Sequence, residues 1–252
     1  MRSAMDAAPT TPTGASGPTG PTAPALPTMP ARAARSMLSA MPVPPAGPAE
    51  LARLALVFQR RLDRLPEGID DGWAALKALR LAIEQVPDGP SRRRLMLTLY
   101  RRWCGPLPDL RLLATPGGRL ALQGRLGLLS RLCAVALAGR PGVLRCCVEI
   151  RARQALEGAL GPAMATLRES SRQGAVVPAH VAAWSPIQWA CVGYADLALA
   201  GAWPHRGLRR LVRLALPARW PVPDGRHQVP VRHACALEGL TRLDALFAKE
   251  PT

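Results

Sequence analysis

Apolar residues recur three and four positions apart through most of this chain, and a proline or glycine follows nearly every such run. The segment 49–65 shows the pattern clearly, from Leu51 and Leu54 to Phe58. This spacing places the apolar side chains on one face of an α-helix. Pro66 then ends the segment, since proline cannot donate the backbone hydrogen bond that a continuing helix needs. No stretch of useful length alternates apolar and polar residues, so the sequence predicts an all-α fold.

The same reasoning predicts about eight or nine helices in one irregular bundle. We expect a loop or short turn over 106–116, a loop over 219–230, and a break in one helix at Ser185-Pro186. Short strands are conceivable only at 175–177 and 226–231. The predicted helices span residues 49–65, 70–86, 91–103, 119–138, 143–160, 162–173, 178–200, 204–216 and 231–249.

Residues 1–48 differ in composition from the rest. They hold 11 of the 27 prolines and no Trp, Tyr or Phe. Such a segment cannot bury enough apolar surface to offset the entropy lost on ordering, so we expect a disordered Pro/Thr/Ala-rich tail. It also lacks the apolar core of a secretory signal. The remainder, 49–252, suits a single all-helical domain. Its apolar runs fall far short of the roughly 20 residues that cross a bilayer, so membrane association is expected only through partners.

The predicted helix 143–160 combines an ordered stripe of charge with apolar residues on most other sides. Charges alternate in sign at every fourth residue from Arg145 to Glu157, which allows pairing from turn to turn. A helix that is apolar on most sides is expected to be surrounded by other helices. Arg151 is the exception, because it falls within the apolar face that carries Cys147. We therefore predict that Arg151 either meets a buried anion or faces a partner.

This helix also carries a resemblance to a known family. Residues 143–161, with the preceding 125–137, resemble the SctK/YscK family of cytoplasmic adaptors in the type III secretion sorting platform. The resemblance covers roughly 120–220 and extends loosely over 49–250. It rests on a pattern of small, apolar and Arg positions rather than on an invariant motif. It continues through Trp184, Trp189, Gly201-Ala-Trp203 and Leu208-Arg-Arg-Leu-Val-Arg-Leu-Ala-Leu-Pro217.

The resemblance implies a non-catalytic scaffold at the cytoplasmic face of the inner membrane. It would link the cytoplasmic domain of an SctD-type inner-membrane ring protein to the pods, which contain an SctQ-type protein and SctL and feed the export ATPase. Partners would therefore be proteins, and nucleic acid is not expected. The long Pro-rich tail departs from the compact start of that family, so the resemblance implies nothing about contacts of residues 1–48.

The net charge of +16 supports an alternative function, that of a basic helical protein that binds nucleic acid or acts as a regulator. Only two of the 33 basic residues are lysines, an excess of arginine that GC-rich coding also produces. The predicted helix 204–216 bears on the choice between these two functions. Its arginines form one face that could be simply solvated or could dock on an acidic protein surface, a phosphate or lipid headgroups. A stripe of arginine alone would grip a DNA backbone without reading bases. These arginines are Arg206, Arg209, Arg210 and Arg213.

Four tryptophans gather in the C-terminal half of the chain, at positions 184, 189, 203 and 220. Tryptophan serves both helix packing and interface hot spots, and packing is the commoner role for any one of them. Trp203 is the best interface candidate, because it comes just before a predicted helix and beside a polar loop.

Catalytic and metal-binding patterns are weak. The histidines at 180, 205, 227 and 233 have no carboxylate four residues away. His233 and Cys235 would supply two zinc ligands, where about four are needed. Asp70-Asp71 is best explained as a helix cap. The six cysteines contain no CxxC pair, which suits a reducing cytosol. We therefore expect no enzyme activity, no cofactor and no metal.

Overall fold

Helices account for all the regular secondary structure in the part of the chain that the computed structural model describes, residues 46–171, 174–221 and 233–248. Thirteen α-helices occur there, nine of them with seven or more residues, and one 3-10 turn, η2 (Pro66–Gly68). The predicted all-α fold is confirmed. The α-helices are α2 (Pro48–Asp63), α3 (Ala74–Glu84), α4 (Pro90–Trp103), α5 (Leu110–Leu113), α6 (Pro116–Ala121), α7 (Arg125–Ala138), α8 (Gly142–Cys146), α9 (Ile150–Leu160), α10 (Ala163–Ser171), α11 (Ala179–Ala182), α12 (Pro186–Leu199), α13 (Arg206–Leu214) and α14 (His233–Phe247).

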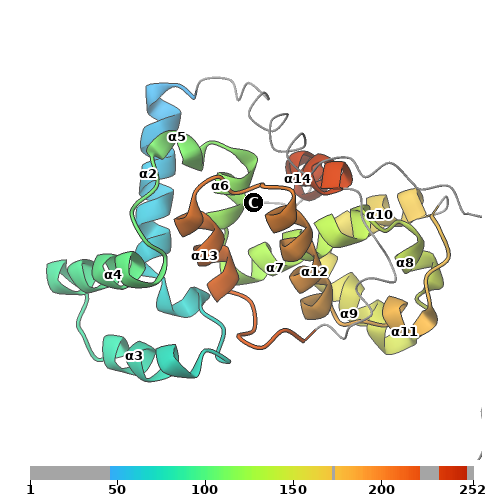
Figure 1. The fold of residues 1–252 in the computed structure, drawn as a ribbon, viewed down its shortest axis with the longest axis horizontal. Coiled ribbons are helices and arrows are strands. Elements are labelled where there is room, and N and C mark those ends of the chain that lie inside the picture. The colour runs from blue at the N-terminus through green and yellow to red at the C-terminus, as the bar shows by residue number, and fades with distance from the viewer. Residues whose placement is uncertain (1–45, 172–173, 222–232, 249–252) are drawn as a thin grey trace, which may run out of the picture. The chain divides into compact units, whose positions relative to one another are not determined.

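The helices α7 and α12 pack against each other at the centre of the described residues (Figure 1). Every residue from Leu132 to Leu137 is buried, because α7 is apolar on nearly all sides. The two backbones approach closely at Gly193, where an added Cβ would lie 2.0 Å from the carbonyl oxygen of Leu132. A side chain at this position would therefore push the central helices apart.

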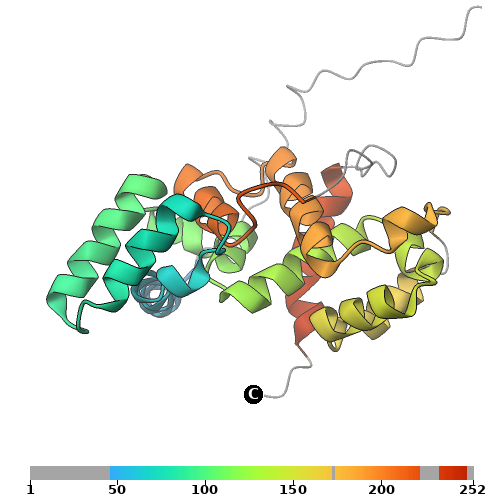
Figure 2. The same cartoon turned by 90° about the horizontal axis from the view of Figure 1, so that it is seen from below.

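The other helices pack around this central pair. On one side, α2 contacts α4 and α5, and α13 contacts α6. On the other side, α8 contacts α10 and α11, while α14 covers α7 and α12. Figure 2 shows the separation from a second direction, with α2, α3 and α4 apart from α8 to α11 and the central pair between the two groups.

A buried ion pair joins the end of α7 to α12. The side chains of Arg140 and Asp196 are 5% and 13% exposed, and two hydrogen bonds of 2.6 and 3.2 Å connect guanidinium and carboxylate. Two parallel bonds of this kind are among the strongest side-chain contacts in proteins. Asp196 is the only charged residue of α12, and its pairing was not predicted.

The helix predicted over 143–160 is interrupted. The chain leaves helical geometry between α8 and α9, where Cys147 has ψ of 88° and Glu149 is extended. Contacts with a distant segment hold α8 in place: Arg145 donates to the Gly174 carbonyl at 2.7 Å, and the Val177 N–H donates to Cys146 Sγ at 3.4 Å. The helix that other helices surround is therefore α7, and the predicted ladder of charge keeps only its second half, in the pair Arg153–Glu157 at 3.5 Å.

Several predicted boundaries also need correction. The helix expected over 119–138 divides into α6 and α7, and the expected loop 106–116 contains the single turn α5. Asp70 and Asp71 do not cap α3. The Asp70 carboxylate instead pairs with Arg125, and that of Asp71 with Arg80.

Some expectations concern residues that are only partly described. Residues 175–177 form no strand. The possible strand at 226–231, most of the loop 219–230 and residues 1–45 of the expected tail lie outside the described residues. Within the described part, Pro48 already belongs to α2.

Candidate functional site

The helix α13 has the two-faced structure that its sequence predicts. His205 stands at its N-terminus, and its Nδ1 accepts a hydrogen bond from the Gly207 N–H at 3.1 Å. This bond satisfies one of the backbone donors that a helix leaves free at its start. The apolar face is buried and packs toward α6, which leaves the arginine face pointing away from the core. The buried members of that apolar face are Leu208, Leu211, Val212 and Ala215.

The arginine face divides into two functionally different halves. Arg213 is half-buried, and its guanidinium donates three hydrogen bonds of 2.7, 2.9 and 3.3 Å to the carbonyl oxygens of residues 216–218. It also lies 5.0 and 5.2 Å from the ring centroids of Trp73 and Trp220. Cation–π contacts and hydrogen bonds to carbonyl oxygens hold a segment of chain in place. Arg213 therefore fastens the segment after α13, a correction to its predicted role in docking.

Arg210 belongs to the same internal half. It is half-buried, and its Nη1 donates to the Trp103 carbonyl oxygen at 3.3 Å. This bond ties α13 to the end of α4, and its guanidinium is correspondingly less available to a partner than the prediction assumed.

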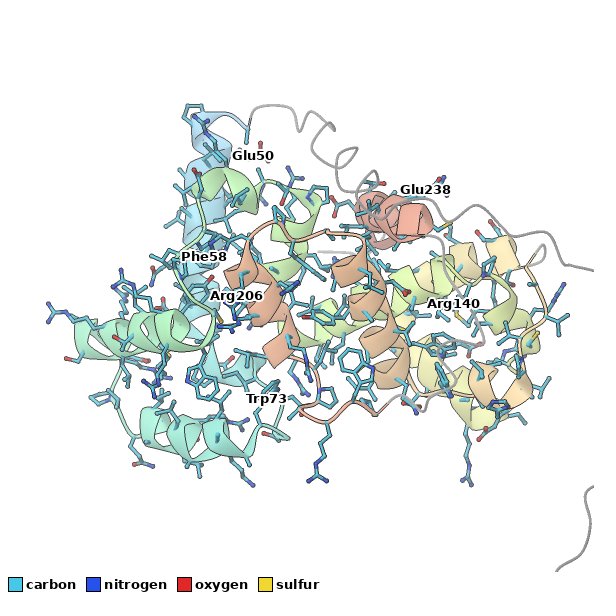
Figure 3. The ribbon with its side chains drawn as sticks, in the orientation of Figure 1. Glu50, Phe58, Trp73, Arg140, Arg206 and Glu238 are labelled. Carbon is cyan, nitrogen blue, oxygen red and sulfur yellow. The ribbon has the colours of Figure 1, made fainter. Side chains whose placement is uncertain are left out.

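Arg206 and Arg209 make up the outer half. Both are exposed, and neither forms an ion pair with any described residue. Figure 3 places Arg206 on the side of α13 that faces α2 and α4. Arg209 lies near Tyr194 on α12. Burial raises the pKa of the Tyr194 phenol, and the positive charge of Arg209 partly opposes that rise.

The end of α4 adds two further exposed arginines, Arg101 and Arg102. The bond from Arg210 to Trp103 brings this end of α4 against α13. Neither Arg101 nor Arg102 has a carboxylate partner among the described residues. We call Arg101, Arg102, Arg206 and Arg209 together the outer arginine surface. Four guanidinium groups without counter-charges attract acidic surfaces and raise association rates with them.

Trp203 is part of the core, in contrast to the predicted interface role. It is 6% exposed, its Nε1 donates to the Gly117 carbonyl oxygen at 2.9 Å, and its ring stacks on Tyr194 at a centroid distance of 5.5 Å. Its contacts are thus with α6 and α12, so packing explains this residue.

Arg151 is not buried, which rules out the predicted buried ion pair. It lies near the start of α9, is exposed and pairs with no described residue. The break before α9 explains the difference, because it turns the chain so that α9 buries Ala152, Leu156 and Leu160 instead. The second expectation, that Arg151 faces a partner, stays a prediction.

The comparisons with known proteins decide the class of the chain. A family model described as bacterial type III secretion protein (HrpB4) matches residues 46–251. The chain belongs to this family. The match supports the type III secretion role that the resemblance implied, while the narrower SctK/YscK assignment stays a prediction. No curated protein and no solved structure matches. Within the described residues, no helix combines the length and the apolar character that crossing a membrane requires.

Proposed function

We propose that this protein is a non-catalytic adaptor of the type III secretion sorting platform. It would link the cytoplasmic domain of an SctD-type ring protein to an SctQ-type pod protein, at the cytoplasmic face of the inner membrane. Membership of a type III secretion family supports the proposal, as does the resemblance to SctK/YscK adaptors between residues 120 and 220.

The observation that carries the proposal is the outer arginine surface. Arg206 and Arg209 project from a helix whose other face is buried, so α13 is held rigidly. A helix that is already fixed loses little backbone entropy on binding, which favours a docking role. Their charge remains uncompensated within the described residues, and an acidic patch on a partner subunit would supply the missing counter-charges.

Co-purification tests the proposal. A tagged chain expressed from its native locus should recover the ring and pod proteins, and the double charge reversal Arg206→Glu/Arg209→Glu should lose at least one of them. The matched control is Arg93→Glu/Arg94→Glu, which changes the charge equally at the opposite end of α4, where both arginines are also exposed. Equal recovery with all three chains would reject the outer arginine surface as a docking site, and absence of both partners from every chain would reject the adaptor role.

Nucleic-acid binding is the alternative function, and the same purified chain can be tested for it. It would appear as duplex or RNA affinity that weakens steeply with salt. The internal use of Arg210 and Arg213 argues against it, because half of the predicted stripe already binds carbonyl oxygens of the chain itself.

A further inference from the structure

A buried arginine near η2, at the end of α2, has no partner in the part of the chain that the structure describes. Arg61 is 7% exposed, and its Nε and Nη2 are shut off from solvent with no hydrogen-bond acceptor among these residues. A buried guanidinium costs several kcal/mol unless an anion or acceptors replace its water. Most buried arginines are therefore paired, and this one calls for an explanation.

The groups around Arg61 do not provide the missing anion. No described carboxylate lies within ion-pair distance, and Glu67, the acid that interacts with it most, is exposed. The Cys104 thiol is near, but burial raises its pKa to about 12, so it is uncharged at neutral pH. Burial also lowers the pKa of Arg61 from 12.5, which is the effect expected of a desolvated cation.

Tyr100 does not supply the missing acceptor either. Its ring packs edge-on against Phe58, one turn before Arg61 on α2, at a centroid distance of 5.7 Å. Its buried hydroxyl lies toward α13, because an added Cβ at Gly207 would lie 2.7 Å from that oxygen. Arg61 therefore remains without an acceptor among the described residues.

Access from solvent is still possible at one edge of the guanidinium. Nη1 makes no hydrogen bond with a described residue and is not among the atoms shut off from solvent. Gly68 leaves room for it, because an added Cβ there would lie 2.1 Å from Nη1. The guanidinium thus fills the space beside Gly68, and a ligand would reach it at the solvent-facing edge of Nη1.

We propose that Arg61 anchors a binding site for an oxyanion, a phosphate or carboxylate group that reaches the guanidinium from solvent at the edge of Nη1. Guanidinium suits this ligand class because its N–H groups match the oxygen spacing of phosphate and carboxylate. The proposal goes beyond the adaptor function and does not depend on it.

Thermal unfolding at pH 7 and constant ionic strength tests the site, with chloride, phosphate and acetate as the compared anions. The wild-type chain should unfold at a higher temperature in phosphate or acetate than in chloride, because a bound ligand stabilises the folded state. Phosphate also stabilises proteins by exclusion from their surface. The Arg61→Met variant measures that general effect. Arg60→Met, which removes the adjacent, exposed arginine, controls for the loss of one positive charge.

The expected result is that Arg60→Met keeps the oxyanion increment and Arg61→Met loses it, which corresponds to a dissociation constant weaker by about tenfold or more. Arg61→Lys keeps a positive charge but loses the planar set of N–H donors, so it should reduce the increment; it carries the test if Arg61→Met does not fold. A larger increment with phosphate indicates a phosphate ligand, and a larger one with acetate indicates a carboxylate, such as a partner side chain. If all three anions act alike on the wild type, or if both Arg61 variants keep the full increment, ordered water satisfies the Arg61 donors and the proposal is wrong.

Discussion

Two arginines of this protein are almost equally buried and have opposite surroundings. Arg140, 6% exposed, meets the Asp196 carboxylate, whereas Arg61, 7% exposed, meets no carboxylate among the described residues. Arg140 follows α7, and its guanidinium is paired with a carboxylate of α12. Arg61 lies near η2, at the end of α2, and lacks an acceptor among the described residues. Burial of an arginine therefore does not define its role, and the presence or absence of a counter-charge separates structural pairing from a candidate binding site.

The largest effect is expected from breaking the paired arginine. Arg140→Met would leave the Asp196 carboxylate buried without its partner, at a cost of about 3–5 kcal/mol in the free energy of unfolding. Chemical denaturation measures this loss. The double variant Arg140→Met/Asp196→Leu should recover much of it, because no charge then remains buried. A loss below about 1 kcal/mol for the single variant would mean that the pair is solvated in solution.

The arginine face of α13 offers a second comparison of the same kind. Arg213→Met removes three carbonyl hydrogen bonds and the contacts with two indole rings, so we expect a loss of about 1–2 kcal/mol. Arg206→Met should change stability by less than about 0.5 kcal/mol, as is usual for an exposed residue. Equal losses in denaturant unfolding would contradict the division of this face into two halves.

The protonation state of Cys104 tests whether Arg61 lacks a counter-ion. The folded thiol, with a pKa of about 12, keeps its proton when the unfolded thiol, near 9.0, has lost it. Stability should therefore fall as the pH rises above 9, by about 1–2 kcal/mol for this thiol at pH 10. Comparing wild type with Cys104→Ala at pH 8 and pH 10 isolates this contribution. A stability that rises over the same interval would show a thiolate paired with Arg61.

The smallest effect is expected at the unpaired arginine itself. In chloride buffer, Arg61→Met removes a charge that gains little from its surroundings, so the free energy of unfolding should stay within about 0.5 kcal/mol of wild type or increase. A loss as large as that of Arg140→Met would mean that Arg61 has an intramolecular partner and would remove the contrast between the two residues.

Much of the fold follows from local sequence, since helical periodicity and proline positions depend on neighbouring residues. The helix predicted over 91–103 and the break at Ser185-Pro186 illustrate this, and the structure has both, with α4 beginning at Pro90. The break between α8 and α9 could not be predicted in this way. It depends on the segment 174–177, which is distant in sequence and bonds to Arg145 and Cys146.

The candidate site shows the same limit. Spacing alone placed Arg206, Arg209 and Arg213 on one face of a helix, and that face exists. Which arginines remain free depends on carbonyl oxygens and indole rings brought in by other segments. Asp196 gave an available signal that was missed, because a single carboxylate in an otherwise apolar helix indicates a buried partner. Arg61 gave none, since its helix contains other arginines at similar spacing.

Export by the type III apparatus tests the adaptor role most directly. In a strain that lacks this gene, the wild-type chain should restore secretion, and Arg93→Glu/Arg94→Glu should do so equally at matched protein level. Arg206→Glu/Arg209→Glu should fail to restore it, with unchanged thermal stability of the purified chain. Normal export from the deletion strain itself would contradict the account.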